Sequence, residues 1–209
     1  MPSNPLSSDS KTLPEMLDGQ PVSNDVLLDQ IAAELYHVAS MILGEGEETV
    51  RIVEEAVMQL DLTAAGGREE DREQERQDAR LAIAGDAVAL LGQRNPADFA
   101  APGENSGPVS CIEDDELDAA GVSRAELERM LTGPDQQHLR GWLEGLSVSL
   151  RVIFVLRAVA GLSSGEIAGV LGEHGGAQSQ AWTSDAVRTE FRQGLCSLAS
   201  QLLHASNAM

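Results

Sequence analysis

Aromatic residues are scarce in this chain, which has three phenylalanines, two tryptophans and one tyrosine among 209 residues. Ala and Leu must therefore fill most of a core, and both favour helices. The alternation of Val, Ile, Thr and Tyr that marks strands is nearly absent. No apolar run reaches the ~18 residues of a membrane span, and the first residues lack the basic-then-apolar pattern of a signal peptide. The sequence predicts an all-α cytoplasmic protein that does not associate with a membrane.

Cysteine and the signatures of catalysis are scarce as well. The two cysteines, Cys111 and Cys196, have no metal-ligand spacing, and we expect both to be reduced and inert in the cytoplasm. The sequence contains no P-loop, GxGxxG or HExxH motif. The four histidines are scattered along the chain, at His37, His138, His174 and His204. We therefore expect no enzyme activity, no catalytic or metal-ligating residues and no cofactor.

Lysine occurs once, as Lys11, and 34 acidic residues outnumber 14 basic ones, which gives a net charge of −20. DNA-binding proteins draw most of their affinity from Lys and Arg on phosphates, so an acidic surface disfavours DNA. The charge is unevenly distributed: residues 25–62 hold nine acids and one arginine, whereas residues 144–209 hold five acids and four arginines. The first segment suits a protein partner with a basic surface, and the second is close to neutral.

The clearest helix signals lie in the C-terminal third of the chain. Apolar residues recur at three- and four-residue spacing over 143–159, which predicts one helix that Gly161 ends. Ser163 and Glu166 form an S-x-x-E capping box, which predicts the start of a short helix. Gly172 is a typical residue at the end of such a helix.

A further amphipathic helix is predicted after residues 173–182, a segment rich in Gly and Gln. Its inward positions recur at helical spacing, at Val187, Phe191, Leu195, Leu198 and Leu202. A short capped helix followed by an amphipathic helix is typical of a helix-turn-helix. The outward side chains are of the types that touch phosphates and base edges. These candidate DNA-binding residues are Thr183, Ser184, Arg188, Thr189, Arg192 and Gln193.

The N-terminal half is predicted to be a helical bundle. Helices are expected over residues 25–43 and 47–62, and the second is expected to bury Val50, Val53, Val57 and Leu60. Residues 68–80 are nearly all charged, and as a helix they would be solvated on every side and would fray. The third bundle helix is therefore expected over 79–91.

Prolines, glycines and a block of acids predict an acidic linker between two helical domains. The expected organisation is a flexible tail at 1–24, an N-terminal domain at 25–95, the linker at 96–134 and a C-terminal domain at 135–209.

Two segments resemble one protein family. LEGLSVSLRVIFVLRAVAGLSSGEIAGVLG, at 143–172, is similar to the C-terminal promoter-reading domain of bacterial sigma factors of the extracytoplasmic-function type, and the similarity resumes at 187–198. LYHVASMILGEGEETVRIVEEAVMQL, at 35–60, resembles the domain with which these factors bind core RNA polymerase. The resemblance implies two small helical domains joined by a linker, the second with a helix-turn-helix.

The resemblance also implies a partner-binding surface. In the family, the helix after the first turn supplies polar contacts to the polymerase. At the matching positions this chain has Glu47, Glu48, Arg51, Glu54 and Glu55. The alternative is that these side chains form an ordinary solvated face. The same alternative applies to Arg188 and Arg192 on the last helix.

One matched helix departs from the family at its functional positions. ARLAIAGDAVALLGQRN, at 79–95, resembles the helix that opens the promoter. Arg80 or Leu81 stands where the family has an aromatic ring, and Gly85 and Asp86 stand in place of Arg-Asn. A basic triplet is replaced by Gly-Gln-Arg at 92–94. Base stacking needs a ring and backbone tracking needs cations, so we do not expect this half to open DNA in the ordinary way.

Two hypotheses from different classes follow. The leading one is a sigma-factor-like transcription initiation or regulation protein, which binds RNA polymerase core and, through its helix-turn-helix, promoter DNA. The alternative is a degenerate sigma mimic, a protein-interaction module that binds an anti-sigma factor and does not bind DNA. The preserved C-terminal skeleton with Arg188 and Arg192 favours the first, whereas the acid excess and the altered opening helix favour the second.

Overall fold

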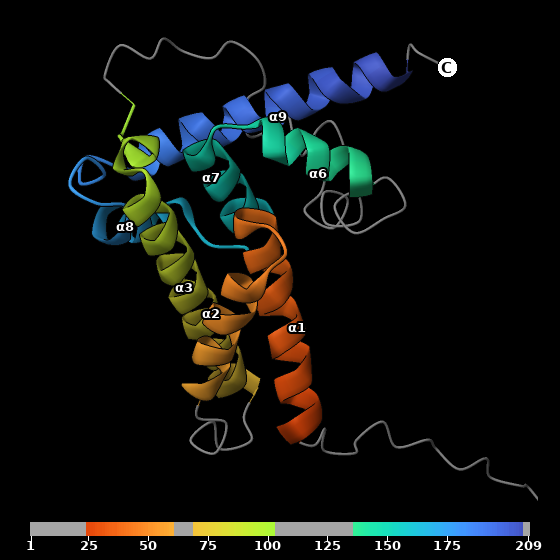
Figure 1. Ribbon diagram of the computed structural model, residues 1–209, viewed down its shortest axis with the longest axis vertical. Coiled ribbons are helices and arrows are strands. Elements are labelled where there is room, and N and C mark those ends of the chain that lie inside the picture. The colour runs from red at the N-terminus through yellow and green to blue at the C-terminus, as the bar shows by residue number, and fades with distance from the viewer. Residues whose placement is uncertain (1–23, 61–68, 103–135, 207–209) are drawn as a thin grey trace, which may run out of the picture.

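The computed structural model describes residues 24–60, 69–102 and 136–206, and every regular element in these ranges is helical (Figure 1). The all-α prediction is confirmed. None of the described helices is both long and apolar enough to cross a membrane. The elements in order are α1 (Asn24–Leu43), α2 (Glu47–Met58), α3 (Glu69–Arg94), the 3-10 helix η1 (Pro96–Phe99), α6 (Gln136–Gly145), α7 (Val148–Ala158), α8 (Ser164–His174) and α9 (Ser184–Ser206).

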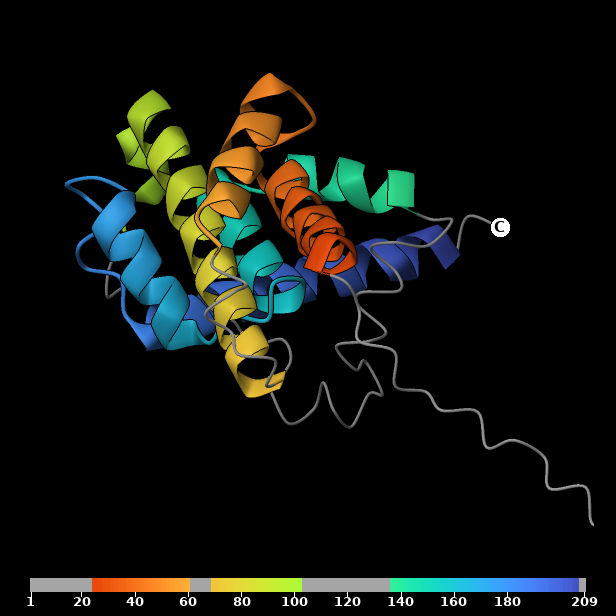
Figure 2. The same cartoon turned by 90° about the horizontal axis from the view of Figure 1, so that it is seen from below.

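The N-terminal half, comprising α1, α2, α3 and η1, is built on three helices that pack against one another (Figure 2). The turn between α1 and α2 depends on Gly44, whose φ of 88° lies in the left-handed region that favours glycine. The Thr49 hydroxyl donates a hydrogen bond of 2.7 Å to the Gly44 carbonyl and fastens the turn. The interior consists of aliphatic side chains that are fully or almost fully buried, among them Ile31, Leu35, Ile42, Ile52, Ile83 and Val88.

The third bundle helix begins at residue 69 rather than 79, so the predicted start of this helix is wrong. The charged residues of its first half are paired instead of being uniformly solvated. Arg76 contacts Glu73 at 3.3 Å, and Arg80 bridges Glu73 at 3.1 Å and Glu34 of α1 at 3.4 Å. Such pairs add support to a helix, and the contact with α1 ties the charged half of α3 to the bundle.

One of the four predicted inward residues of α2 points outward. Val50 is 43% exposed, whereas its neighbours Thr49 and Ile52 are buried. Val53 is buried as expected, and Val57 and Leu60 pack at the edge of the core. Thr49 takes the inward place because its hydroxyl bonds to the turn, which rotates Val50 to the surface.

The C-terminal half, comprising α6–α9, begins with two helices where one was predicted. The Ser147 hydroxyl accepts the Leu150 N–H and starts α7 afresh after α6. The capping box is confirmed: Ser163 Oγ accepts the Glu166 N–H at 3.2 Å, and Glu166 Oε2 accepts the Ser163 N–H at 2.7 Å. α8 continues past Gly172, the predicted end, to His174.

An aromatic cluster holds α6, α7 and α9 together. The Phe154 ring is fully buried and meets Trp142 edge-on, with a centroid distance of 4.9 Å. It also packs against Phe191 of α9 at 5.5 Å. Trp142 Nε1 donates a hydrogen bond of 3.0 Å to Ser197 Oγ. Three of the six aromatic residues in the chain therefore lie at this one junction.

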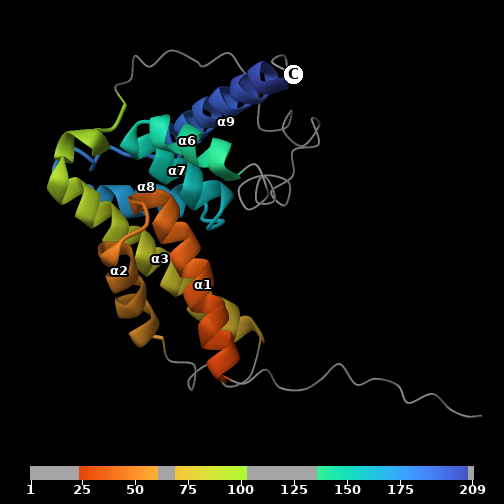
Figure 3. The same cartoon turned by 45° about the vertical axis from the view of Figure 1, so that its right-hand side comes forward.

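The two halves are joined along two lines. α3 packs against α8, and α1 packs against α7, so the buried apolar residues of both halves form one continuous cluster (Figure 3). α9 packs on α7 and α8, and its far end extends beyond both (Figures 1 and 3).

Cys196 on α9 is disulfide-bonded, so the expected reduced thiol is wrong for this residue. Cys111 lies outside the described residues. The spacing of cysteines along the sequence can indicate a metal site. It does not indicate a disulfide, because that bond depends on which sulfur atoms the fold brings together.

Candidate protein and nucleic-acid interfaces

The predicted partner-binding residues lie together on the outer face of α2. Glu47, Glu48, Arg51, Glu54 and Glu55 are all exposed. Arg51 pairs with Glu55 at 3.5 Å, one helical turn away. Glu48 contacts Arg94 of α3, and this hydrogen bond lowers the pKa of the Glu48 carboxyl. With one arginine among five charged residues, the face is strongly acidic.

Apolar side chains interrupt this acidic face. Val50, Tyr36 of α1 and Met58 are exposed, Met58 to 77%. Tyr36 and Val50 line a shallow surface depression together with Glu47, Arg51 and Glu54. Exposed apolar side chains rimmed by charge are the usual composition of a protein interface. Neither Val50 nor Tyr36 was predicted for this surface from the sequence. Helical periodicity assigns Val50 to the core.

The predicted DNA-binding residues lie around the start of α9. Thr183 Oγ1 accepts the Ala186 N–H and caps the helix. Thr183, Arg188 and Gln193 are exposed, whereas the other three, Ser184, Thr189 and Arg192, are half-buried. All six residues therefore lie at the N-terminal cap of α9 or in its first ten residues. α9 packs against α7 and α8.

The charges at this helix start cancel. Residues 184–193 contain two arginines, Arg188 and Arg192, and two acids, Asp185 and Glu190, so their sum is zero. Arg188 is held by Asp185 at 2.6 Å. A phosphate would have to compete with that carboxylate for the guanidinium, which weakens the electrostatic part of DNA binding.

Glu190 is half-buried on α9, and burial raises the pKa of its carboxyl. Because the folded-state pKa lies above the unfolded value, ionisation of Glu190 costs stability as the pH rises through that range. Glu190→Gln should therefore raise the free energy of unfolding near pH ~7 by a small amount. The gain should disappear near pH ~3, well below the ordinary glutamate pKa of ~4.3, where the carboxyl is protonated in both states.

Urea unfolding of the wild type and Glu190→Gln at both pH values tests this prediction. Glu173→Gln, an exposed carboxylate at the end of α8, serves as the control and should change little. An equal gain at both pH values would show that packing, not ionisation, separates the two proteins.

The helix that resembles the promoter-opening element is largely covered. Its two glycines, Gly85 and Gly92, are buried against the C-terminal end of α8. Leu81 is half-buried, and Arg80 is held by Glu73 and Glu34. Strand opening requires an aromatic ring for base stacking and cations on an exposed surface. These four positions supply neither.

Trp182 is a residue whose role the sequence did not reveal. It is buried, and its Nε1 donates a hydrogen bond of 2.9 Å to the Phe99 carbonyl of η1. One signal in the sequence was available: a large apolar residue stands within a segment rich in Gly and Gln. Because such a residue is usually buried, it indicates that the segment packs against another part of the fold.

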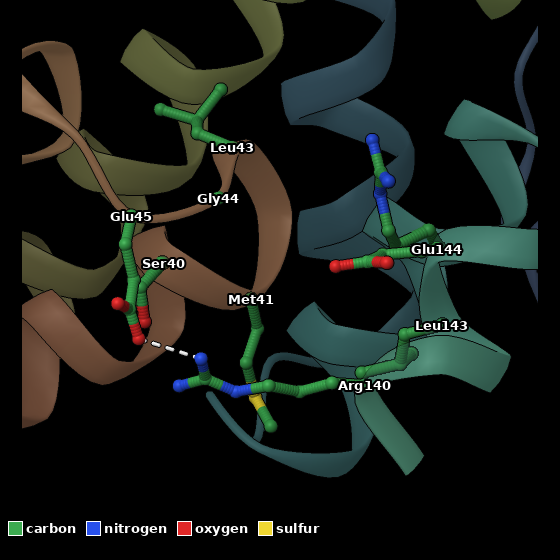
Figure 4. Close-up of a pocket in the computed structure, with 9 residues that line it drawn as sticks. Ser40, Met41, Leu43, Gly44, Glu45, Arg140, Leu143 and Glu144 are labelled. Carbon is green, nitrogen blue, oxygen red and sulfur yellow. Dashed lines mark hydrogen bonds and ion pairs between the residues drawn. The ribbon is translucent and has the colours of Figure 1, made fainter. Parts of the chain in front are cut away.

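A cavity of about 390 Å³ lies between the end of α1 and the start of the C-terminal half (Figure 4). Arg140 of α6 crosses it to Glu45, with an N–O distance of 2.6 Å. Arg151 of α7 lines the cavity, and burial lowers the pKa of its guanidinium. Its buried Nε has no hydrogen-bond partner among the described residues. Glu144 also lines the cavity, so two carboxylates face two arginines there.

In the described part of the chain, no group of three or more His, Cys, Asp or Glu side chains is placed to hold a metal ion. Comparisons of the chain with protein-family models, with curated proteins and with solved structures found no match.

Proposed function

We propose that this chain is a sigma-factor-like transcription protein that acts in the cytoplasm. In this proposal the face of α2 binds core RNA polymerase, α8 and α9 form a helix-turn-helix, and the start of α9 contacts promoter DNA. Residues 25–95 and 135–209 correspond to the two sigma domains that the resemblance implies.

The observation that carries the proposal is the exposed face of α2. It combines four carboxylates with the exposed side chain of Val50, on the helix whose sequence resembles the polymerase-binding element. Tyr36 of the neighbouring helix α1 lies beside Val50 in the same surface depression. Apolar contacts supply binding energy, and charges of one sign select a partner with a basic surface.

The first test is capture of core RNA polymerase by the full chain. Replacing Glu47 and Glu54 with lysine should weaken capture at least about tenfold, since a like-charge contact then faces the basic partner. The matched control is Asp29→Lys with Glu70→Lys, two exposed carboxylates of α1 and α3 that lie off this face. Both double variants change the net charge by the same amount. Equal losses for the two would show that net charge alone, and not the α2 face, governs capture.

The DNA-contact part is tested at Arg188. Arg188→Gln should lower promoter binding and should reduce the slope of log K against log salt by about 1, because one phosphate contact is lost. Arg51→Gln on α2 removes an exposed arginine of the same kind, also paired with a carboxylate, and should leave DNA binding unchanged. The measurement is a salt titration of promoter binding between ~50 and ~200 mM. An unchanged slope for Arg188→Gln would remove α9 from the DNA interface.

A second candidate function is favoured by a specific observation, the cancelled charge of residues 184–193. In that alternative the chain is a sigma mimic that binds an anti-sigma factor and does not bind DNA. The polymerase assay separates the two. A protein that captures core polymerase but no promoter at ~50 mM salt contradicts the DNA-contact part, and one that captures an anti-sigma factor but no polymerase supports the mimic.

A further inference from the structure

Two glycines on α3 leave a channel along one face of the helix. Gly85 and Gly92 are seven residues apart, about two helical turns, and therefore share a face. A Cβ atom on Gly92 would lie 3.1 Å from the Gly175 carbonyl oxygen and 3.2 Å from its carbon. A Cβ atom on Gly85 would lie 3.0 Å from His174 Nε2. The C-terminal end of α8 occupies the channel, and at Gly92 a Cβ atom would be closer to the Gly175 backbone than most real Cβ atoms come to a neighbour, so that backbone would have to move by a few tenths of an ångström.

The segment 173–182, which follows in the chain, is fixed to the N-terminal half at two further points. Trp182 donates its buried hydrogen bond to the Phe99 carbonyl, and the Ala101 N–H donates to the Gln178 carbonyl at 3.4 Å. Ser179 is fully buried and donates a hydrogen bond of 2.7 Å to the Gly176 carbonyl, which holds the segment in its folded shape.

The opposite end of α8 is also attached to α3. Gln77 Nε2 donates a hydrogen bond of 2.8 Å to Glu166 Oε1, while the other oxygen of Glu166 accepts the Ser163 N–H in the capping box. The same carboxylate therefore starts α8 and joins it to α3. α8 is connected to the N-terminal half from its first turn to its last.

We propose that residues 173–182 form an intramolecular lock. The lock closes the C-terminal half onto α3 through the glycine channel, and its release would let α8 separate from α3 without unfolding α1 and α2. The relation to DNA rests on the proposed function: Gly85 and Gly92 stand at positions where the sigma resemblance has cations, so the lock covers the face of α3 that corresponds to the promoter-opening surface of the family.

The two glycines provide a matched pair of variants. Alanine at either position gains the same helix preference over glycine. At Gly85 the new methyl group meets the end of the flexible His174 side chain, which can rotate away. At Gly92 it meets the backbone of Gly175, which cannot yield without moving the lock. Gly92→Ala should therefore open the lock, whereas Gly85→Ala should leave it closed.

Amide hydrogen exchange of the free full chain measures this directly, independently of polymerase or DNA. Gly92→Ala should speed exchange in residues 82–93 and 176–183 on the order of tenfold relative to Gly85→Ala. Exchange in α1 and α2 should stay as in the wild type. Equal exchange in the two variants would overturn the lock, and so would equal acceleration throughout α1 and α2, because the contact would then be part of one inseparable core.

Should Gly92→Ala fail to fold, the wild type supplies the same test. Exchange at rising low concentrations of urea separates partial openings from global unfolding. The lock requires residues 176–183 to lose protection in an opening that leaves α1 and α2 protected. Loss of protection in all three only at global unfolding would contradict it.

Discussion

Trp182→Ala is expected to lower the free energy of unfolding by about 3–5 kcal/mol, the range typical of a buried tryptophan. The indole is buried between the two halves, so its removal leaves a void. It also leaves the Phe99 carbonyl without the hydrogen bond that the indole donates. Phe99 is itself fully buried, so water does not readily replace the lost donor. Urea unfolding followed by circular dichroism measures the change.

Trp182→Phe separates the two parts of that loss. The ring then still fills most of the space, and the missing hydrogen bond alone should cost about 1–3 kcal/mol. A Trp182→Ala midpoint equal to that of the wild type would mean that the indole is not packed against η1 in solution.

Local signals in the sequence were sufficient wherever a few neighbouring residues decide the structure. The capping box at Ser163 and Glu166 is an example, because its two hydrogen bonds join residues three apart. The inward positions Val187, Leu195 and Leu198 of α9 followed from helical spacing alone, and all three are buried. The all-α class followed from composition.

Contacts between distant segments decided the features that the sequence did not predict. Periodicity placed Val50 in the core, but the Thr49 hydroxyl bonds back to Gly44 and turns Val50 outward. From the sequence, the segment 173–182 is only a stretch rich in Gly and Gln before the last helix. Its docking depends on Phe99 and Gly92, which lie more than 70 residues away in sequence, and no local pattern encodes that partner.

The same contacts change the interpretation of the altered opening helix. From the sequence, Gly85 and Gly92 are simply losses of cations. In the fold they are the positions at which α3 admits the backbone of α8, and a larger residue at Gly92 would clash there. The glycines therefore have a structural role of their own, which is compatible with either proposed function.

Phe154→Ala is expected to lower the free energy of unfolding by about 3–5 kcal/mol, as large as the effect at Trp182 but by a different route. The aromatic partners of the Phe154 ring are Trp142 of α6 and Phe191 of α9. The loss should therefore fall on the junction of α6, α7 and α9. Phe154→Leu, which keeps an apolar side chain of intermediate size, should recover part of it.

The Gly194 backbone of α9 makes the Phe154 site demanding. A Cβ atom at Gly194 would lie 3.0 Å from Phe154 Cδ2, so α9 approaches the ring as closely as the absence of a side chain permits. In the Phe154→Ala background, Gly194→Ala adds a methyl group next to the void and should restore part of the lost stability. In the wild type the same substitution forces the buried ring to shift, which offsets the helix preference that alanine gains over glycine. Gly194→Ala should therefore be more favourable in the Phe154→Ala background than in the wild type, and an equal effect in both backgrounds would show that the two residues do not share one packed site.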